Sequence, residues 1–175
     1  MDSKITKGRY TIKMKKEGYA ALLLLCTVCG LSLASVWHLY CPYSAALLQT
    51  AARSIGGFQA RLGGTLFSLL LVFWLGFSCL RHFPLMAVAI LRSFSTTALC
   101  YIGFSLLDGC HLAVFALISA LKLLLFIAFC RLALLFGDGR RKHPCYFRRY
   151  CLQYAGDFLF ICGISSLLCI LPYGI

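Results

Sequence analysis

Long runs of hydrophobic residues alternate with short polar segments along this 175-residue chain. A helix needs about 20 mostly apolar residues to cross the hydrocarbon core of a bilayer. Five runs reach or approach that length, and short polar breaks such as Asp108-Gly109 separate them. The pattern predicts an all-α, polytopic transmembrane helical bundle of about five spans. The expected spans are residues 19–40, three helices within 65–136, and 157–175.

Basic residues gather between these runs and indicate an orientation. The chain has 17 Lys and Arg but only five acidic residues, which gives a formal net charge of +12. The basic residues are densest in the N-terminal segment 1–18 and in a predicted loop at 137–156, and cytoplasmic segments carry such an excess. We therefore predict that the N-terminus lies inside and the C-terminus outside.

The same loop is expected to contact anionic lipid. Basic residues beside a membrane are each worth about 1 kcal/mol of attraction to anionic headgroups. Because the charges stand in short blocks between apolar runs, we expect a lipid surface and no nucleic acid as the partner. The lipid-facing basic residues of the loop are Arg140, Arg141, Lys142, Arg148 and Arg149.

The segment 41–64 is the longest piece expected outside the membrane, and two interpretations of it stay open. Its apolar residues recur near helical spacing, as in an amphipathic helix on the outer surface. Alternatively, the segment extends the second span outward, with breaks at the glycine pairs 56–57 and 63–64. The apolar residues concerned are Leu47, Leu48, Ala51, Ile55 and Phe58.

The start of the chain also allows two readings. A basic region, an apolar core and Ser32-Leu33-Ala34 resemble a cleavable secretory signal. The apolar run continues through Trp37 and Leu39, however, which favours a retained helix that ends in an interfacial aromatic belt.

Signatures of catalysis and of cofactor or metal binding are missing from the sequence. Of the 11 cysteines, most lie in apolar runs, where they behave as small hydrophobic residues. His143, Cys145 and Cys151 lack the paired spacing of a zinc site. We expect no enzyme activity, no cofactor and no metal. Cys41 and Cys110 share the outer face and form a disulfide only if the fold brings them together.

Charged residues inside the predicted spans are the most informative candidates for a site. Arg92 and Lys122 fall within the third and fourth spans, where a charge costs at least about 3 kcal/mol. Both are expected at a similar depth, and Asp157, at the start of the fifth span, is the nearest acid expected. One carboxylate cannot neutralise two cations. Either the side chains reach along their helices to the headgroups, or one meets a partner's acid, a lipid phosphate or an anionic substrate.

A motif around the second and third spans resembles a known family. Residues 70–78 read LLVFWLGFS, a proline then opens the next apolar helix, and Arg-Ser-Phe and Gly-Phe steps follow. This arrangement is similar to the stage II sporulation protein M family of endospore-forming bacteria. The residues that carry the resemblance are Trp74, Gly76, Phe77, Pro84, Arg92, Ser93, Phe94 and Gly103.

The resemblance implies a non-catalytic scaffold in the bacterial cytoplasmic membrane. Such a scaffold anchors peptidoglycan-remodelling partners, namely cell-wall hydrolases or their activators, during sporulation engulfment. Trp74, Gly76, Pro84 and Arg92 would form its shared core. The alternative function is a transporter or permease subunit for a small anionic or lipid-like solute. Transporters often contain internal repeats, and no repeat between the halves is evident, which favours the scaffold.

Overall fold

The computed structural model describes residues 3–40, 57–78, 81–107, 109–142 and 147–170. Nearly all of these residues are helical, and the described part of the chain contains no strand. The all-α prediction is therefore confirmed. The helices are α1 (Ser3–Tyr40), α3 (Phe58–Phe77), α4 (His82–Leu106), α5 (Gly109–Lys142) and α6 (Phe147–Ile170).

Each of the five helices contains a stretch long and apolar enough to cross a membrane. In the most apolar part of each stretch, only 17% to 28% of the residues are buried within the bundle. Large apolar side chains lie exposed on its outside, among them Leu25, Phe67, Trp74 and Leu167. A water-soluble protein of this size rarely exposes so much contiguous apolar surface. The chain is a multi-pass integral membrane protein.

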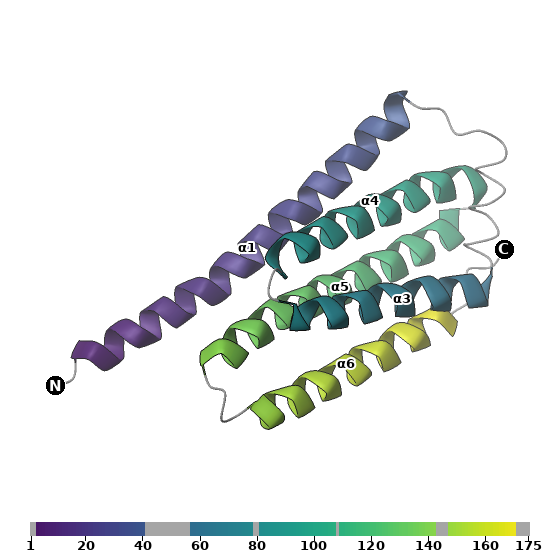
Figure 1. The fold of residues 1–175 in the computed structure, drawn as a ribbon. Helices are drawn as coiled ribbons and strands as arrows, with labels where there is room; N and C mark the ends of the chain where they lie inside the picture. Colours follow the sequence, from purple (N-terminus) through teal and green to yellow (C-terminus); the bar gives the residue numbers. More distant parts are fainter. Residues whose placement is uncertain (1–2, 41–56, 79–80, 108, 143–146, 171–175) are drawn as a thin grey trace.

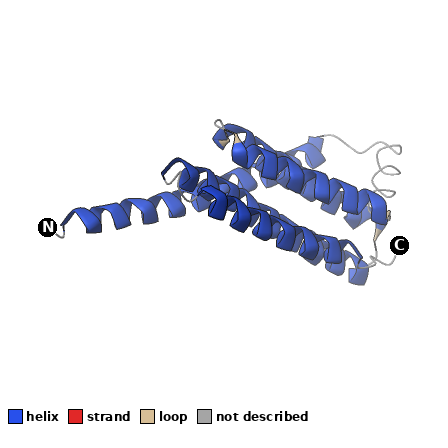
Figure 2. Cartoon of the chain, turned by 60° about the horizontal axis from the view of Figure 1, so that its bottom comes forward, coloured by secondary structure: helices blue, strands red, loops and turns tan. Residues whose placement is uncertain are grey.

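The helices lie side by side and run up and down, as Figure 1 shows. Helix α5 is central and contacts α1, α3, α4 and α6, while α1 packs mainly on α4. The first turns of α1 project beyond the other helices (Figure 2). We call the end that holds the starts of α3 and α5 the outer end, since the predicted orientation places it outside. The opposite end is the inner end.

Aromatic packing against a glycine holds α3, α5 and α6 together. Tyr154 of α6 is 2% exposed and stacks on Phe136 and Phe73, with ring centroids 4.4 and 5.0 Å apart. It fits there because Gly76 of α3 has no side chain. A Cβ added at Gly76 would lie 2.6 Å from the Tyr154 hydroxyl oxygen.

Helices α1 and α4 approach closely at a second glycine. A Cβ added at Gly30 would lie 2.6 Å from the carbonyl oxygen of Ile90 and 2.7 Å from the Cβ of Ser93. The Ser93 hydroxyl is satisfied within its own helix, because it donates to the carbonyl of Ala89 at 2.7 Å. Small residues that allow backbones this close are a common means of joining helices in lipid.

The helices extend further than the apolar runs indicated. Within the expected loop 137–156, α5 continues to Lys142 and α6 begins at Phe147. Polar residues beyond the bilayer can continue a helix without hydrophobic burial, so hydropathy underestimates its length. Residues 137–142 and 147–156, which were expected to belong to a loop, are helical instead.

Residues 58–64 of the expected external segment 41–64 are helical. α3 begins at Phe58, and Gly63-Gly64 lies within it without a break. Residues 58–64 thus continue the second span, and the break that the second interpretation expected at Gly63-Gly64 does not occur. Leu47, Leu48, Ala51 and Ile55 lie outside the described residues, as does Cys41.

Candidate functional site

A polar pocket lies between α3, α4 and α5 in the outer part of the bundle. Its volume is about 210 Å³. Helix α3 supplies Ala60, Arg61, Gly64 and Thr65, α4 supplies Arg92, Ser95, Thr96 and Leu99, and α5 supplies Phe115, Ser119 and Lys122.

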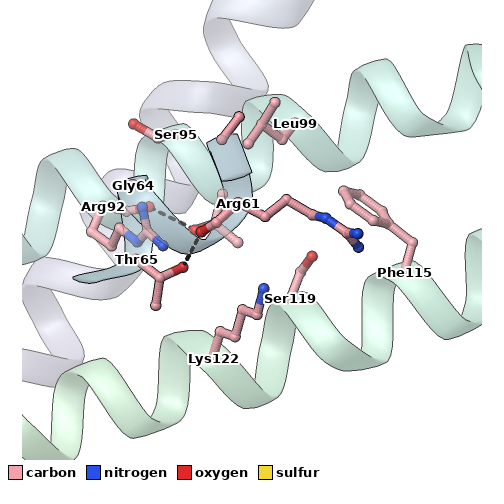
Figure 3. Close-up of a pocket in the computed structure, with 11 residues that line it drawn as sticks. Arg61, Gly64, Thr65, Arg92, Ser95, Leu99, Phe115, Ser119 and Lys122 are labelled. Carbon is pink, nitrogen blue, oxygen red and sulfur yellow. Dashed lines mark hydrogen bonds between the residues drawn. The ribbon is translucent and has the colours of Figure 1, made fainter. Parts of the chain in front are cut away.

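Three cations from three helices line this pocket. Figure 3 shows Arg61 extending toward Phe115 and Lys122 rising beside Ser119, while Arg92 approaches from the opposite side, near Thr65. Among the described lining residues there is no carboxylate. The pocket therefore concentrates positive charge inside a membrane-spanning bundle.

Three hydroxyl side chains of the lining hydrogen-bond to their own helices. Thr65 and Thr96 each donate to the carbonyl oxygen four residues earlier, at 2.8 Å, and Ser95 does the same with Leu91 at 2.8 Å. Such bonds satisfy the hydroxyl hydrogen and leave an oxygen lone pair available. The hydroxyls add polarity to the pocket without competing for the cations as charged partners do.

Helix α6 contacts two residues of the pocket lining. Cys169 of α6 is fully buried, and its Sγ lies 3.2 Å from the Nζ of Lys122 and 3.8 Å from the Oγ1 of Thr65. A thiol is only a weak hydrogen-bond partner for an ammonium group. The contact places the Lys122 ammonium group beside a buried thiol.

The depth of the pocket follows from the helical rise. At 1.5 Å per residue, Arg92 lies about 16 Å along α4 from Arg81, and Lys122 lies about 24 Å along α5 from Asp138. Because Arg81 and Asp138 are paired near the inner end, the pocket spans the middle and outer parts of a layer about 30 Å thick. It lies farther from the inner surface than the apolar runs indicated, since α5 continues past Arg131.

The structure thus brings two of the three predicted intramembrane residues together. Arg92 and Lys122 line one pocket, and neither lies at the inner end, where the cytoplasmic headgroups are expected. Asp157 is absent from the described lining, and it lies about 18 Å along α6 from Cys169. It cannot serve as their counter-ion.

Arg61 is the member of the cluster that the sequence analysis missed. It was assigned to the external segment because it precedes the apolar core of its helix. Its spacing from Thr65 is one helical turn, so both residues share a face of α3. The hydroxyl residue Thr65, four positions after Arg61, was the sequence feature that could have placed Arg61 on a polar face of this helix.

A second charged cluster at the inner end was also missed. The Arg81 side chain, 3% exposed, donates from Nη2 to Oδ1 of Asp138 at 2.8 Å. Tyr19 of α1 donates to Oδ2 of Asp138 at 2.7 Å. The sequence analysis did not single out Arg81, and it placed Asp138 in a loop, whereas α5 continues through this residue.

Comparison of the chain with protein-family models, with curated proteins and with solved structures gave no match. The resemblance to the sporulation family therefore rests on the short motif alone.

Most of the motif residues are packing positions. Gly76 contacts Tyr154, and Gly103 faces Phe115, whose ring atoms would lie 3.2 Å from an added Cβ. Ser93 is buried against α1, and Phe94 contacts Trp37 edge-to-face with centroids 6.3 Å apart.

The remaining motif residues differ in burial. Phe77 is half-buried and contacts Phe136 and Tyr154, and Pro84 lies in the first turn of α4, where a missing N–H is tolerated. Trp74 is 75% exposed, so it lies on the outside of this bundle and not in its core.

The basic residues of the predicted lipid-facing loop lie on two helices. Arg148 and Arg149 are exposed in the first turn of α6. Arg140, Arg141 and Lys142 belong to the last turns of α5. In the described part of the chain no cluster of His, Cys, Asp and Glu is suited to hold a metal ion. His143 and Cys145 lie outside that part.

Proposed function

We propose that this membrane protein binds an anionic group in the three-cation pocket, as a transporter or permease subunit for a small anionic or lipid-like solute. The observation that carries the proposal is the convergence of Arg61, Arg92 and Lys122 on one polar pocket. The three residues come from three different helices, so only the assembled bundle forms the site.

Positive charge is costly inside a membrane-spanning bundle, because lipid solvates it poorly. Each cation within the bilayer costs at least a few kcal/mol unless a partner or water compensates it. No described carboxylate lines the pocket, and Asp138 is already paired with Arg81. Arg and Lys supply donors suited to carboxylate or phosphate oxygens, so an anion in the pocket would meet positive side chains from three helices.

Thermal unfolding of the purified protein in an uncharged detergent tests anion binding. Phosphate, sulfate, acetate and an anionic lipid are added separately at constant ionic strength. A ligand present at 100 times its Kd stabilises the folded state by about 2.7 kcal/mol, so at least one of these anions is expected to raise the Tm.

The variants Arg61→Gln, Arg92→Gln and Lys122→Gln are expected to abolish or reduce that rise. Arg131→Gln is the matched control, because Arg131 is an exposed cation of α5 outside the pocket lining. An equal loss in the control, or a full rise in all three pocket variants, contradicts a role for the pocket.

Proteoliposomes test the transport part of the proposal. The anion that raises the Tm is expected to cross the membrane faster in vesicles with the wild-type protein than in vesicles with Arg92→Gln. Binding without any difference in flux rejects transport and leaves a binding protein.

A second candidate function is the non-catalytic scaffold implied by the sporulation-family resemblance. On this proposal the protein resides in the bacterial cytoplasmic membrane and anchors cell-wall hydrolases or their activators during engulfment. It is supported by an exposed aromatic side chain in the motif. Trp74 shares an exposed apolar region of α3 with Phe67, Leu70 and Leu71, which suits contact with a partner helix as well as with lipid.

Co-purification from native membranes tests this candidate. Trp74→Ala is expected to release captured cell-wall hydrolases, whereas Leu159→Ala, an exposed apolar residue of α6, retains them. Arg92→Leu distinguishes the two functions. Loss of partner capture supports the scaffold, whereas normal partner capture with lost uptake of the anion supports the permease. Recovery of an ATP-hydrolysing subunit in place of hydrolases supports the permease.

A further inference from the structure

A lysine and a cysteine from different helices are in contact inside the bundle. The Nζ of Lys122 on α5 lies 3.2 Å from the Sγ of Cys169 on α6, and the Oγ1 of Thr65 on α3 lies 3.8 Å from the same sulfur. Cys169 is fully buried. A thiol is a weak hydrogen-bond partner, so hydrogen bonding to the sulfur contributes little to this contact. A nucleophilic nitrogen and a nucleophilic sulfur therefore lie side by side, separated by a gap that a single oxygen atom can span.

We propose that Lys122 and Cys169 are a redox-modification site, at which dioxygen joins the two side chains through an N–O–S bridge. The amine, the thiol and one molecule of dioxygen give the bridge and one molecule of water. The O–O bond breaks, N–O and S–O bonds form, and the hydrogens lost from nitrogen and sulfur leave in the water. Dioxygen accepts four electrons, two from sulfur and two from nitrogen. An ammonium and a thiolate hold the same protons in total and give the same products.

The surroundings of the pair favour dioxygen as the oxidant. Lys122 and Cys169 both belong to helical stretches apolar enough to cross a membrane, and polar or charged oxidants enter such surroundings at a high cost. Dioxygen is small and apolar, so it dissolves in lipid and needs no open path from water. The flexible stem of the lysine lets its nitrogen approach the sulfur as the bridge forms.

The bridge has two consequences for the bundle. It ties α5 to α6 next to Ile170, where α6 ends, about 22 Å along α6 from Tyr154 and its aromatic packing. It also removes a positive charge from the pocket that Lys122 lines, because a nitrogen bonded to oxygen is a weak base. This second consequence rests on the proposed anion-binding function. The oxidised protein is expected to show a smaller anion-dependent rise in Tm than the reduced protein.

Mass spectrometry of the intact protein tests the bridge directly. The full chain is purified in detergent under argon, and half of it is then exposed to air. The bridge is expected to add the mass of one oxygen atom less two hydrogens, whereas a disulfide only loses two hydrogens and a sulfenic acid only gains an oxygen. Digestion of the air-exposed sample is expected to yield one product that contains both Lys122 and Cys169.

A thiol reductant supplies a second measurement on the same sample. Dithiothreitol is added after the protein has been unfolded in SDS. It is expected to break the S–O bond, to form its own cyclic disulfide and to leave the oxygen on the Lys122 nitrogen. The freed Cys169 thiol is then detected by alkylation.

Two variants and one internal cysteine are the controls. Lys122→Arg keeps a cation but replaces the amine by a guanidinium group, and Cys169→Ser removes the sulfur. Neither variant is expected to give the linked product. Cys130 is the matched thiol of the wild-type protein, because it is also fully buried but packs in the aromatic and aliphatic core. It is expected to stay unmodified in air.

The linked product from air-exposed wild-type protein alone supports the modification site. An unmodified Cys169 in air overturns it, as does oxidation of Cys169 to the same extent in Lys122→Arg. Equal oxidation of Cys130 also overturns it, because the oxidant then does not select the lysine–cysteine contact.

Measurements of Tm separate the bridge from the function of the pocket. Phosphate, sulfate, acetate and an anionic lipid are compared in the argon and air samples. A bridge with equal rises in both samples supports the modification site and overturns its control of anion binding. A bridge with no rise in the argon sample supports the modification site and overturns the proposed function.

Discussion

Arg81, immediately before α4, donates a hydrogen bond of 2.8 Å to Asp138 of α5, and the pair is largely buried at the inner end of the bundle. Tyr19 of α1 donates to the other carboxylate oxygen of Asp138 at 2.7 Å. One carboxylate therefore joins three helices. It also fixes the registry of α4 against α5, the two helices that carry Arg92 and Lys122 to the pocket.

Replacing Asp138 by Asn is expected to destabilise the protein by about 3 to 5 kcal/mol, because the Arg81 charge stays buried without its counter-ion. The measurement is unfolding of the purified protein in mixed micelles. In the double variant Arg81→Met/Asp138→Leu, most of the lost stability is expected to return, since no charge is then left buried. A double variant less stable than Asp138→Asn contradicts the charge argument.

Gly137→Ala is expected to disrupt the same pair by a steric route. An added Cβ would collide with the guanidinium end of Arg81, so the side chain must leave its place beside Asp138. We expect a loss of about 1 to 3 kcal/mol. Gly156→Ala is the control, since nothing lies within 4 Å of its added Cβ, and alanine favours helix by about 1 kcal/mol. Equal stability of the two variants excludes the collision.

Gly76 and Tyr154 are expected to be energetically coupled. Gly76→Ala places a methyl group 2.6 Å from the Tyr154 hydroxyl oxygen and is expected to cost about 1 to 3 kcal/mol. Tyr154→Phe removes a buried hydroxyl that has no hydrogen-bond partner in the described structure, so it is expected to stabilise the protein by about 1 kcal/mol. The double variant recovers part of the loss, because Ala133 still lies 3.3 Å from the methyl group. If the free-energy changes of the two single variants simply add in the double variant, Gly76 and Tyr154 are not coupled.

The orientation can be checked with a membrane-impermeant maleimide on intact cells. Cys110 is exposed near the start of α5, at the end predicted to lie outside, and is expected to be modified. A cysteine introduced by Arg148→Cys, at the exposed start of α6, is expected to react only after the cells are opened. Mass spectrometry of the modified peptides gives the answer, and the reverse pattern of labelling inverts the topology.

The architecture was predictable because it depends on properties that each segment has alone. A run of about 20 apolar residues is unstable in water and must be helical in lipid, where every backbone group needs an internal partner. The span containing Trp74 and the span opened by Pro84 were therefore recognisable without knowledge of their neighbours. Helix ends were less predictable, as the continuation of α5 to Lys142 shows.

The site depended on relations that no single segment contains. The sequence by itself determined that Arg92 and Lys122 lie within spans and that the chain has few acids to compensate them. Only the tertiary structure decided that Arg61 joins them, that Asp157 does not, and that Asp138 is taken by Arg81. The physical reason is that hydropathy sets the depth of a residue, whereas the choice and rotation of neighbouring helices, set by close contacts such as Gly30 with Ser93, decide which charges meet.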